Sequence, residues 1–337
     1  MIQIERTAII GILLLLCPLI LFSPFVQARD FQPFHSSNKN PFVAIFGLPS
    51  VQAARGPEKG EYEIRLTQEI SNHFVSDLSL NESIYIDGES WQTTLSARVG
   101  VSAEMDIGIE LGRLTHKGGS LDGFIENWHD TFNLPNSTRN ETARNQLLFL
   151  YIRDGTTRTN ITRSTSGLTD SSLYLAIDNP LGEFQNWHTS IRTGVKFSTG
   201  DPDLFTGSGN TDYFIDFLIQ QHAPDIDRSY SWYAGAGLMH TGSSDWADDF
   251  QKRQVFFGHA GLVWHATEKL DFKLQLDTHS AFYYSKLKPL GKNTMQLIMG
   301  GSLSIGKHYM LDIGVSEDLF PGTGPDVSFQ IALTKRS

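Results

Sequence analysis

The sequence predicts an all-β protein, a transmembrane antiparallel up-and-down β-barrel, from three observations. In residues 270–277 apolar and polar residues alternate strictly, which predicts a strand with one apolar and one polar face. The apolar face consists of Leu270, Phe272, Leu274 and Leu276, and the polar face consists of Asp271, Lys273, Gln275 and Asp277. The pattern recurs along the chain, and an apolar export signal precedes it. Strands of a soluble sandwich also alternate, but there the pattern seldom recurs with the charges kept on one side. A closed wall between lipid and a polar lumen predicts the recurrence, because closure leaves no backbone group unpaired in hydrocarbon.

Residues 1–28 are predicted to be a cleaved signal peptide. A charged start is followed by a nearly unbroken apolar run at 7–22 and by the small-residue pattern Val26-Gln27-Ala28, after which we expect cleavage. Pro24 and a polar stretch without a basic cluster follow the run, which disfavours a membrane anchor. The only cysteine, Cys17, lies behind Leu16 in this segment, which disfavours a lipoprotein. We therefore expect export through the inner membrane and a location in the cell outer membrane.

Composition excludes several classes of protein. The 337 residues carry a formal net charge of −10, which disfavours nucleic acid as a partner. Removal of Cys17 leaves the mature chain without a thiol, so the fold must rest on backbone pairing instead of disulfides. No later apolar run is long enough for a transmembrane helix. No metal, nucleotide or haem spacing occurs, so we expect neither a metal nor a cofactor.

A catalytic site is not expected either. Asp277, His279 and Ser280 are close in sequence, but Ser280 points to the strand face opposite the other two, so they cannot form a nucleophilic relay. We assign no catalytic residue, expect no enzyme, and interpret the histidines as hydrogen-bonding groups of the lumen.

The mature chain is predicted to start with an extended segment. Apolar residues between 31 and 50 show no period, so we expect residues 29–60 to form a periplasmic N-terminal segment at the barrel mouth and residues 61–337 to form the barrel.

The first three strands follow from alternation. Residues 62–74 form the first, and Asp87-Gly88 is predicted to be the hairpin tip before the second, because Asp-Gly favours the positive φ of a tight turn. The second strand runs from Ser90 to Val101, and a short turn at 102–104 leads to a third at 105–111. Short turns alternate with long loops in such barrels.

The alternation then stops, and residues 120–134 have helical spacing. Ser120 is the expected N-cap and Pro135 follows the segment, whose apolar stripe is Leu121, Phe124, Ile125, Trp128 and Phe132. One interpretation is a loop that packs its own apolar side. The other is a gate or plug helix over an apolar substrate path, because long loops are usually functional or ordered against something.

Strand patterns return after this loop. Residues 145–153 and 157–163 flank an Asp154-Gly155 turn, and strands follow at 173–177 and 187–197. The next loop contains the distinctive residues Thr199, Gly200, Asp201, Gly207, Gly209 and Asp212. Its glycines permit close return of the backbone. Three carboxylates here, Asp201, Asp203 and Asp212, are compatible with one cation, but turn chemistry explains them equally well.

Seven more strands complete the barrel, at 213–220, 230–238, 256–266, 270–280, 295–305, 309–315 and 327–333. The expected count is about 14 strands, or 12 if the weak pair at 145–163 is left out, and either even number puts both ends in the periplasm. Aromatic residues near strand ends are typical of interfacial girdles: Tyr230, Trp232, Tyr233, Trp264, Phe282, Tyr283, Tyr284, Tyr309 and Phe329. The polar faces assign six charged residues to the lumen: Glu63, Arg65, Glu69, Asp271, Lys273 and Asp277.

Several segments together resemble a known family. They are residues 42–49, the stretch 121–130, the Thr199-Gly200-Asp201 and Gly207-Ser208-Gly209 pair, Glu317-Asp318 and Pro325-Asp326. The chain resembles the proteobacterial outer-membrane family called domain of unknown function 3187 over nearly all of its mature length. The Thr-Gly-Asp and Gly-Ser-Gly segment is also similar to that of outer-membrane transporters associated with phenol degradation, although Gly167-Leu168-Thr169-Asp170 departs from their Gly-Leu-Gly-Asp. The resemblance implies a barrel in the outer membrane and no particular activity.

Two functions are compatible with these observations. One is a passive channel or binding barrel for small apolar or amphipathic molecules. The other is a structural or surface-interaction barrel with a plugged lumen, which the mixed charges of the lumen face permit. Expected partners are outer-membrane lipid and lipopolysaccharide, the barrel-assembly machinery and a small apolar solute.

Overall fold

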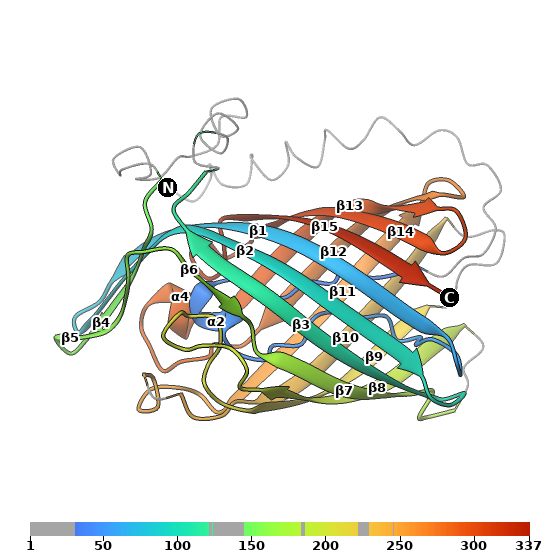
Figure 1. Ribbon diagram of the computed structural model, residues 1–337, viewed down its shortest axis with the longest axis horizontal. Helices are drawn as coiled ribbons and strands as arrows, with labels where there is room; N and C mark the ends of the chain where they lie inside the picture. The colour runs from blue at the N-terminus through green and yellow to red at the C-terminus, as the bar shows by residue number, and fades with distance from the viewer. Residues whose placement is uncertain (1–30, 121–122, 124–144, 183–185, 222–228, 245) are drawn as a thin grey trace.

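The computed structural model describes residues 31–120, 123, 145–182, 186–221, 229–244 and 246–337. Within them, twelve antiparallel strands close into a barrel (Figure 1). These wall strands are β1 (Tyr62–Leu78), β2 (Glu82–Gly100), β3 (Met105–Lys117), β7 (Ser171–Asp178), β8 (Trp187–Phe197), β9 (Asp212–Gln221), β10 (Tyr230–His240), β11 (Gln254–His265), β12 (Leu270–His279), β13 (Thr294–Ile305), β14 (Tyr309–Asp318) and β15 (Val327–Arg336). The barrel closes where β1 pairs with β15, from Glu63 opposite Arg336 to Asn72 opposite Val327. The all-β fold class is confirmed, with the smaller of the two predicted strand counts.

Three further strands lie outside the wall. β4 (Leu148–Arg153) pairs with the start of β2 and with β5 (Thr156–Ile161), and β6 (Thr165–Leu168) pairs with the end of β3. Figure 1 shows β4 and β5 as a hairpin that projects beyond one end of the barrel. The weak pair of predicted strands therefore exists but extends a wall hairpin instead of completing the wall.

One predicted turn is wrong. Asp87 and Gly88 do not form a hairpin tip, because β2 runs through them and the connection from β1 lies at residues 79–81. Gly88 has φ 141°, and a Cβ there would lie 2.9 Å from the carbonyl oxygen of Lys117. The glycine allows two backbones to approach closely within the sheet. In the sequence, a glycine with this role cannot be distinguished from a glycine in a turn.

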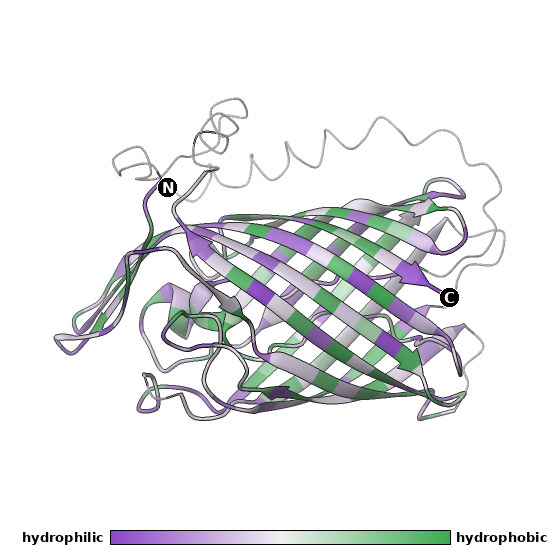
Figure 2. Cartoon of the chain, in the orientation of Figure 1, coloured by the Kyte–Doolittle hydropathy of each residue, from purple (hydrophilic) through white to green (hydrophobic). Residues whose placement is uncertain are grey.

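The two strand faces alternate as the sequence predicts (Figure 2). On β12, Leu274 and Leu276 point outward and are 41% and 39% exposed. Their neighbours Lys273 and Gln275 point inward and are 4% and 0% exposed. The outer surface is thus apolar and the interior polar, which is the distribution that a barrel in lipid requires.

The aromatic residues divide into two groups. Tyr230, Trp232 and Tyr309 are largely exposed on the outer surface, in agreement with a girdle. Tyr233, Phe282 and Tyr283 are instead buried inside the molecule, so their assignment to a girdle is wrong. Tyr233 occupies an inward position of its strand, and the other two lie in the loop after β12.

The ends of the barrel differ in their connections. Turns such as 101–104, 266–269 and 306–308 join the strands at one end, here called the short-turn end, where β1 begins and β15 ends. Loops such as 198–211, 241–253 and 280–293 lie at the other, the long-loop end, together with two short helices, α2 (Pro41–Ala44) and α4 (Lys288–Gly291) (Figure 1). No helix in the described part of the chain has the length and apolar character to cross a membrane.

Replacement of Leu274 by arginine tests the outer face. Leu274 lies near the middle of β12 and points outward, so Leu274→Arg is expected to lower the free energy of unfolding in lipid by about 2–4 kcal/mol. Urea titration of the barrel in phospholipid vesicles measures this change, with Leu274→Met as the apolar control. Equal stability of the arginine and methionine variants would mean that this face does not contact hydrocarbon.

Candidate functional site

Residues 31–58, here called the lumenal segment, lie inside the barrel. The segment ascends beside β12, where three of its residues bond three successive inward side chains. The Phe34 amide donates to Gln275 Oε1 at 2.9 Å, and Ser36 Oγ donates to Asp277 Oδ2 at 2.5 Å. Asn38 Nδ2 contacts His279 Nε2 at 2.8 Å. Both chains are extended with a repeat of two residues, which keeps this pairing in step. The segment therefore lies deeper than the periplasmic position at the barrel mouth that we expected for residues 29–60.

The segment turns below the long loops and descends on the opposite side of the lumen. Asn40 starts α2, and its side chain accepts a hydrogen bond from the Phe42 amide. Five backbone groups of the descending part then bond the wall: the amides of Gly47, Ala54 and Gly56 donate to Asp212, Gln220 and Asp178, and the carbonyls of Ser50 and Ala53 accept from Arg192 and Arg98. Lys59 finally bridges to Gly100 beside the start of β1. The segment therefore spans the lumen twice.

An aromatic cluster closes the lumen at the long-loop end. It consists of Phe42 from α2, Tyr151 from β4, and Phe205, Trp246, Phe250 and Tyr283 from three loops. The ring of Phe42 is fully buried, with its centroid 5.0 Å from that of Phe205 and 5.7 Å from that of Trp246. The Tyr283 hydroxyl donates to the Phe42 carbonyl at 2.6 Å, and burial raises the pKa of this phenol well above its ordinary value. Tyr283 is thus a neutral donor that fixes α2 in the cluster.

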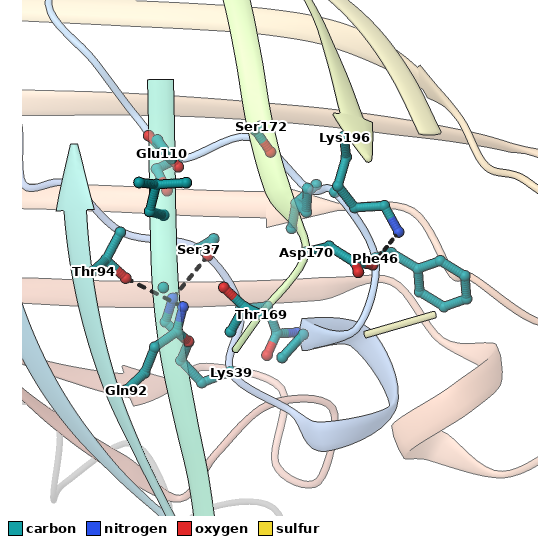
Figure 3. Close-up of a pocket in the computed structure, with 17 residues that line it drawn as sticks. Ser37, Lys39, Phe46, Gln92, Thr94, Glu110, Thr169, Asp170, Ser172 and Lys196 are labelled. Carbon is teal, nitrogen blue, oxygen red and sulfur yellow. Dashed lines mark hydrogen bonds and ion pairs between the residues drawn. The ribbon is translucent and has the colours of Figure 1, made fainter. Parts of the chain in front are cut away.

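A smaller apolar contact divides the lumen near the short-turn end. Phe31 and Val51 of the lumenal segment pack there against Tyr233 and Val263 of the wall. Below this contact a cavity of about 640 Å³ is lined by charged residues that include Arg55, Glu61 and Arg336. A cavity of only about 70 Å³ remains in the middle of the lumen (Figure 3). The lumenal segment therefore occupies the space between the two ends.

The charges of the wall are largely neutralised within the wall. Three buried cations pair with wall carboxylates at 2.5–2.8 Å: Arg192 with Asp216, Arg98 with Asp106, and Lys273 with Asp312. Arg192, Arg98 and Lys273 use further donors on carbonyls of the lumenal segment. If the segment left, these ion pairs would remain intact, and water would replace the carbonyls.

Two side chains of the segment contact wall glutamates. His35 Nε2 lies 2.7 Å from Glu110 Oε1, and Lys39 Nζ lies 3.3 Å from Glu69 Oε2. Side-chain bonds also hold the ascending part, such as that from Arg65 Nη2 to Gln32 Oε1 at 3.0 Å, whereas backbone atoms make most of the polar contacts between the descending part and the wall.

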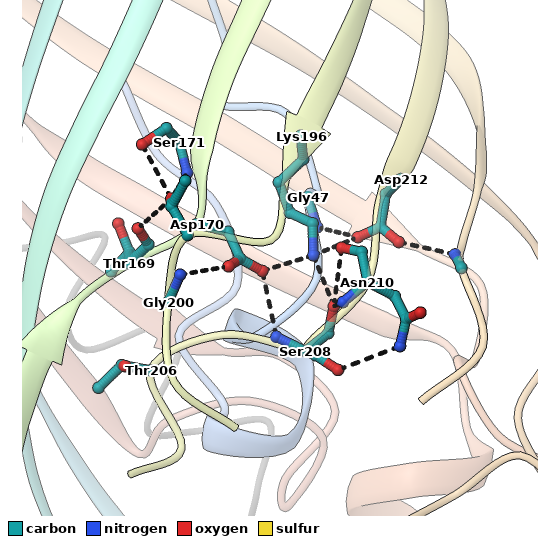
Figure 4. A network of polar contacts seen from close by, with 12 residues as sticks. Gly47, Thr169, Asp170, Ser171, Lys196, Gly200, Thr206, Ser208, Asn210 and Asp212 are labelled. Carbon is teal, nitrogen blue, oxygen red and sulfur yellow. Dashed lines mark hydrogen bonds and ion pairs between the residues drawn. The ribbon is translucent and has the colours of Figure 1, made fainter. Parts of the chain in front are cut away.

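The loop between β8 and β9 forms a lysine cluster with the segment (Figure 4). Lys196 Nζ lies 2.6 Å from Asp170 Oδ2, 3.0 Å from Asp212 Oδ2 and 2.5 Å from Ser208 Oγ. The Gly200 amide donates to Asp170 Oδ1 at 2.7 Å, and Asp212 accepts from the Gly47 amide at 2.8 Å. The lysine cluster is defined here as Asp170, Lys196, Ser208 and Asp212. It joins the loop, the wall and the turn of the lumenal segment.

Comparison with known families identifies the chain. The family described as protein of unknown function DUF3187 matches residues 9–337. The chain belongs to the DUF3187 family. This confirms the resemblance seen in the sequence. A search of the curated proteins finds no match to the chain.

Solved structures support the barrel architecture of this DUF3187 protein. The COG4313 outer membrane channel from Pseudomonas putida F1 aligns with a TM-score of 0.55 and 9% identity, over 84% of this chain and 98% of that one. The NanC porin aligns with a TM-score of 0.45 and 10% identity, over 81% of this chain and 98% of that one. The toluene transporter TodX of P. putida aligns with a TM-score of 0.39 and 8% identity, over 84% of this chain and 91% of that one. At 9% identity, the similarity to the COG4313 channel shows the fold alone, which is that of an outer-membrane barrel.

The predicted site residues of the DUF3187 protein occupy different places. The lumen set points inward and is buried or nearly so: Glu63, Arg65, Glu69, Asp271, Lys273 and Asp277. Asp201 is not part of the lysine cluster that contains Asp212. Its carboxylate accepts hydrogen bonds from the amides of Asp203 and Leu204 in its own turn. No group of three potential metal ligands occurs among the described residues.

The other loop residues support the backbone of this region. Thr199 bonds Ser171, and a Cβ on Gly207 would lie 2.4 Å from Asp170 Oδ1, so glycine is needed for that approach. Gly209 has φ 77°, a conformation that favours glycine. The predicted gate helix with Leu121, Phe124, Ile125, Trp128 and Phe132 lies outside the described residues, so its role remains a prediction.

Sequence reasoning missed the residues that hold the lumenal segment. Arg98, Arg192 and Lys196 occupy inward positions of their strands, so the alternation that identified Lys273 was sufficient to place them in the lumen. Lys39 and Phe42 have no such signal, because the lumenal segment has no periodic pattern.

A methyl group at Gly47 is expected to loosen the segment. A Cβ there would lie 2.7 Å from Lys196 Cβ, so Gly47→Ala must displace the turn and weaken its bond to Asp212. Hydrogen exchange measured by mass spectrometry should become faster in residues 41–50 while the wall strands stay protected. Ser37→Ala, a change of similar size in the same segment, is the control: it removes the bond from Lys39 Nζ to Ser37 Oγ but leaves the lysine cluster intact, so exchange in residues 41–50 should stay unchanged. Unaltered exchange in the Gly47 variant would show that the lysine cluster does not hold the segment.

Proposed function

We propose that the protein is an outer-membrane channel for small apolar or amphipathic molecules, with the lumenal segment as its removable plug. The observation that carries the proposal is the position of Phe42, whose ring fills an aromatic cluster at the long-loop end. A site that encloses a phenyl ring between Phe205, Trp246 and Tyr151 offers the same contacts to an apolar solute once Phe42 leaves.

The orientation follows from the proposed location. In outer-membrane barrels the short turns are periplasmic and the long loops extracellular. The aromatic cluster then faces the exterior and the cavity of about 640 Å³ opens to the periplasm. The predicted signal peptide agrees with this location, and one protein of the same fold is described as an outer membrane channel.

The way in which the plug is held supports its removal. The buried wall cations keep their carboxylate partners without it. Loss of the segment breaks hydrogen bonds that water can replace, the contacts of His35 with Glu110 and of Lys39 with Glu69, and the apolar contacts of four residues: Phe31, Val51, Phe42 and Phe46. An apolar solute that occupies the aromatic cluster would compensate part of this loss, since it binds only the open state.

Solute uptake by liposomes tests the proposal. We expect liposomes with the full mature protein to admit small aromatic solutes faster than protein-free liposomes do, and to exclude sugars of similar size. Deletion of residues 31–58 is expected to raise both rates, because it frees the lumen between the two ends. Conductance in planar bilayers gives a second readout of the same deletion.

A structural barrel with a permanently closed lumen is the second candidate. The filled lumen favours it, since only about 70 Å³ remains in the middle. In that case the intact protein passes no solute of either kind, and only the deletion variant conducts. That result, with a folded barrel confirmed by slower gel migration after heating, would reject transport by the intact protein.

A further inference from the structure

A basic patch lies on the outer surface of the barrel near the long-loop end. Trp91 of β2, Thr115 of β3 and Ser166 of β6 are aligned in successive strands of the sheet, and Arg113 and Lys117 flank Thr115 on the same face of β3. These five residues are called the outer basic patch. Arg113 and Lys117 thus place two positive charges on the outer surface of a protein whose net charge is −10.

The side chains of the patch hold each other in place, and within the described part of the chain neither cation has a carboxylate partner. Arg113 donates from Nε and Nη2 to Ser166 Oγ at 3.3 and 3.2 Å, and Thr115 Oγ1 lies 2.9 Å from the same hydroxyl. Lys117 Nζ lies 3.8 Å above the centroid of the Trp91 ring. Glu89, opposite Lys117 in the ladder, accepts from Trp91 and Ser120. No ion pair joins Arg113 or Lys117 to any carboxylate of the described residues.

The patch lies at the level of a lipid headgroup. At about 3.3 Å per residue and a strand tilt of about 40°, Arg113 is about 20 Å and Lys117 about 30 Å above the start of β3, so the pair straddles the upper edge of an apolar band about 25 Å tall. Below it the outer surface presents Ile109, Leu111 and Leu95, which are 40%, 43% and 44% exposed. A ligand of this surface therefore combines anionic groups at the upper edge of the band with acyl chains beneath them.

We infer that the outer basic patch binds the phosphorylated glucosamine headgroup of lipopolysaccharide. Arg113 and Lys117 are four residues apart on one strand, about 13 Å between Cα atoms, so they match a headgroup with two phosphates better than a lipid with one. Phosphate accepts the paired N–H groups of a guanidinium, and the Thr115 and Ser166 hydroxyls add neutral donors beside it. The inference rests on the proposed outer-membrane location and does not depend on transport.

Lipid binding to the purified barrel tests the inference. The full mature protein in detergent micelles is titrated with lipopolysaccharide, and bound lipid is measured by native mass spectrometry. Arg113→Gln with Lys117→Gln is expected to weaken binding at least tenfold. The matched control is Lys307→Gln with Lys335→Gln at the short-turn end, where Lys335 lies over the Tyr62 ring as Lys117 lies over Trp91. The control pair is expected to bind as the unchanged protein does.

Two further titrations identify the chemistry. Lipopolysaccharide without its phosphates and phosphatidylglycerol are both expected to bind at least tenfold more weakly than the intact lipid. Equal binding of the dephosphorylated lipid, or unchanged binding by the Arg113 and Lys117 variant, would overturn the inference. Equal binding of phosphatidylglycerol would assign the patch to any anionic lipid and would also overturn it. Solute uptake by the same variants is expected to be unchanged, which separates failure of this site from failure of the channel.

Discussion

A disulfide between the lumenal segment and the wall is expected to abolish solute passage, and its reduction is expected to restore it. Ser36→Cys with Asp277→Cys places two thiols where the native side chains are 2.5 Å apart between Ser36 Oγ and Asp277 Oδ2. A disulfide requires Cβ atoms about 3.5–4.5 Å apart, and the segment can adjust to this distance because hydrogen bonds alone tie it to β12 at this point. Cys17 lies in the predicted signal peptide, so no other thiol of the mature chain competes.

The physical reason is that the cross-link keeps the plug in place without filling more of the lumen. If passage needs departure of the segment, the oxidised variant is closed and the reduced variant open. Uptake of a small aromatic solute by liposomes, measured before and after addition of a reductant, gives the two rates. Ser36→Cys alone is the control, and its rate should not respond to the reductant. Equal uptake by the oxidised and reduced double variants would show that the solute passes beside the plug or does not pass at all.

The wall was predictable from the sequence because its signal is local. In residues 270–277 of β12 each inward residue is polar and each outward residue apolar, so the neighbours Lys273 and Leu274 reveal the faces without reference to the rest of the chain. Strand number was less certain, because β4 and β5 have the same local pattern but pair beyond the wall. Which strands close a barrel depends on distant pairing, such as that of β1 with β15.

The plug was not predictable for a related reason. Wall side chains bind the backbone of the lumenal segment, as Arg192 does at the Ser50 carbonyl and Asp212 at the Gly47 amide. Every residue has such backbone groups, so these contacts impose no periodic pattern on residues 31–58. Phe42 and Phe46 belong to an apolar run that is visible in the sequence, but their partners Tyr283 and Phe282 come from a loop more than 230 positions away.

Removal of one partner of the buried wall ion pair between Arg192 and Asp216 is expected to have a large effect on stability. Arg192 and Asp216 are 2% and 3% exposed, and Arg192 Nη2 lies 2.5 Å from Asp216 Oδ2. Arg192→Leu leaves the carboxylate buried without its counterion, which is expected to lower the free energy of unfolding by about 3–5 kcal/mol. Urea unfolding in detergent micelles, followed by tryptophan fluorescence, measures the change.

The double variant Arg192→Leu with Asp216→Leu separates charge from packing. It removes both charges from a site lined by Tyr174 and Phe214, whose rings lie 5.4 and 5.1 Å from the guanidinium carbon. Stability should therefore recover to within about 1–2 kcal/mol of the unchanged protein, since two apolar side chains then fill the site. The Ser50 carbonyl still loses its donor, so residues 48–52 should exchange amide hydrogens faster in both variants. If the double variant is as unstable as Arg192→Leu, the unpaired carboxylate is not the cause of the lost stability. The arginine would then act mainly by holding the lumenal segment.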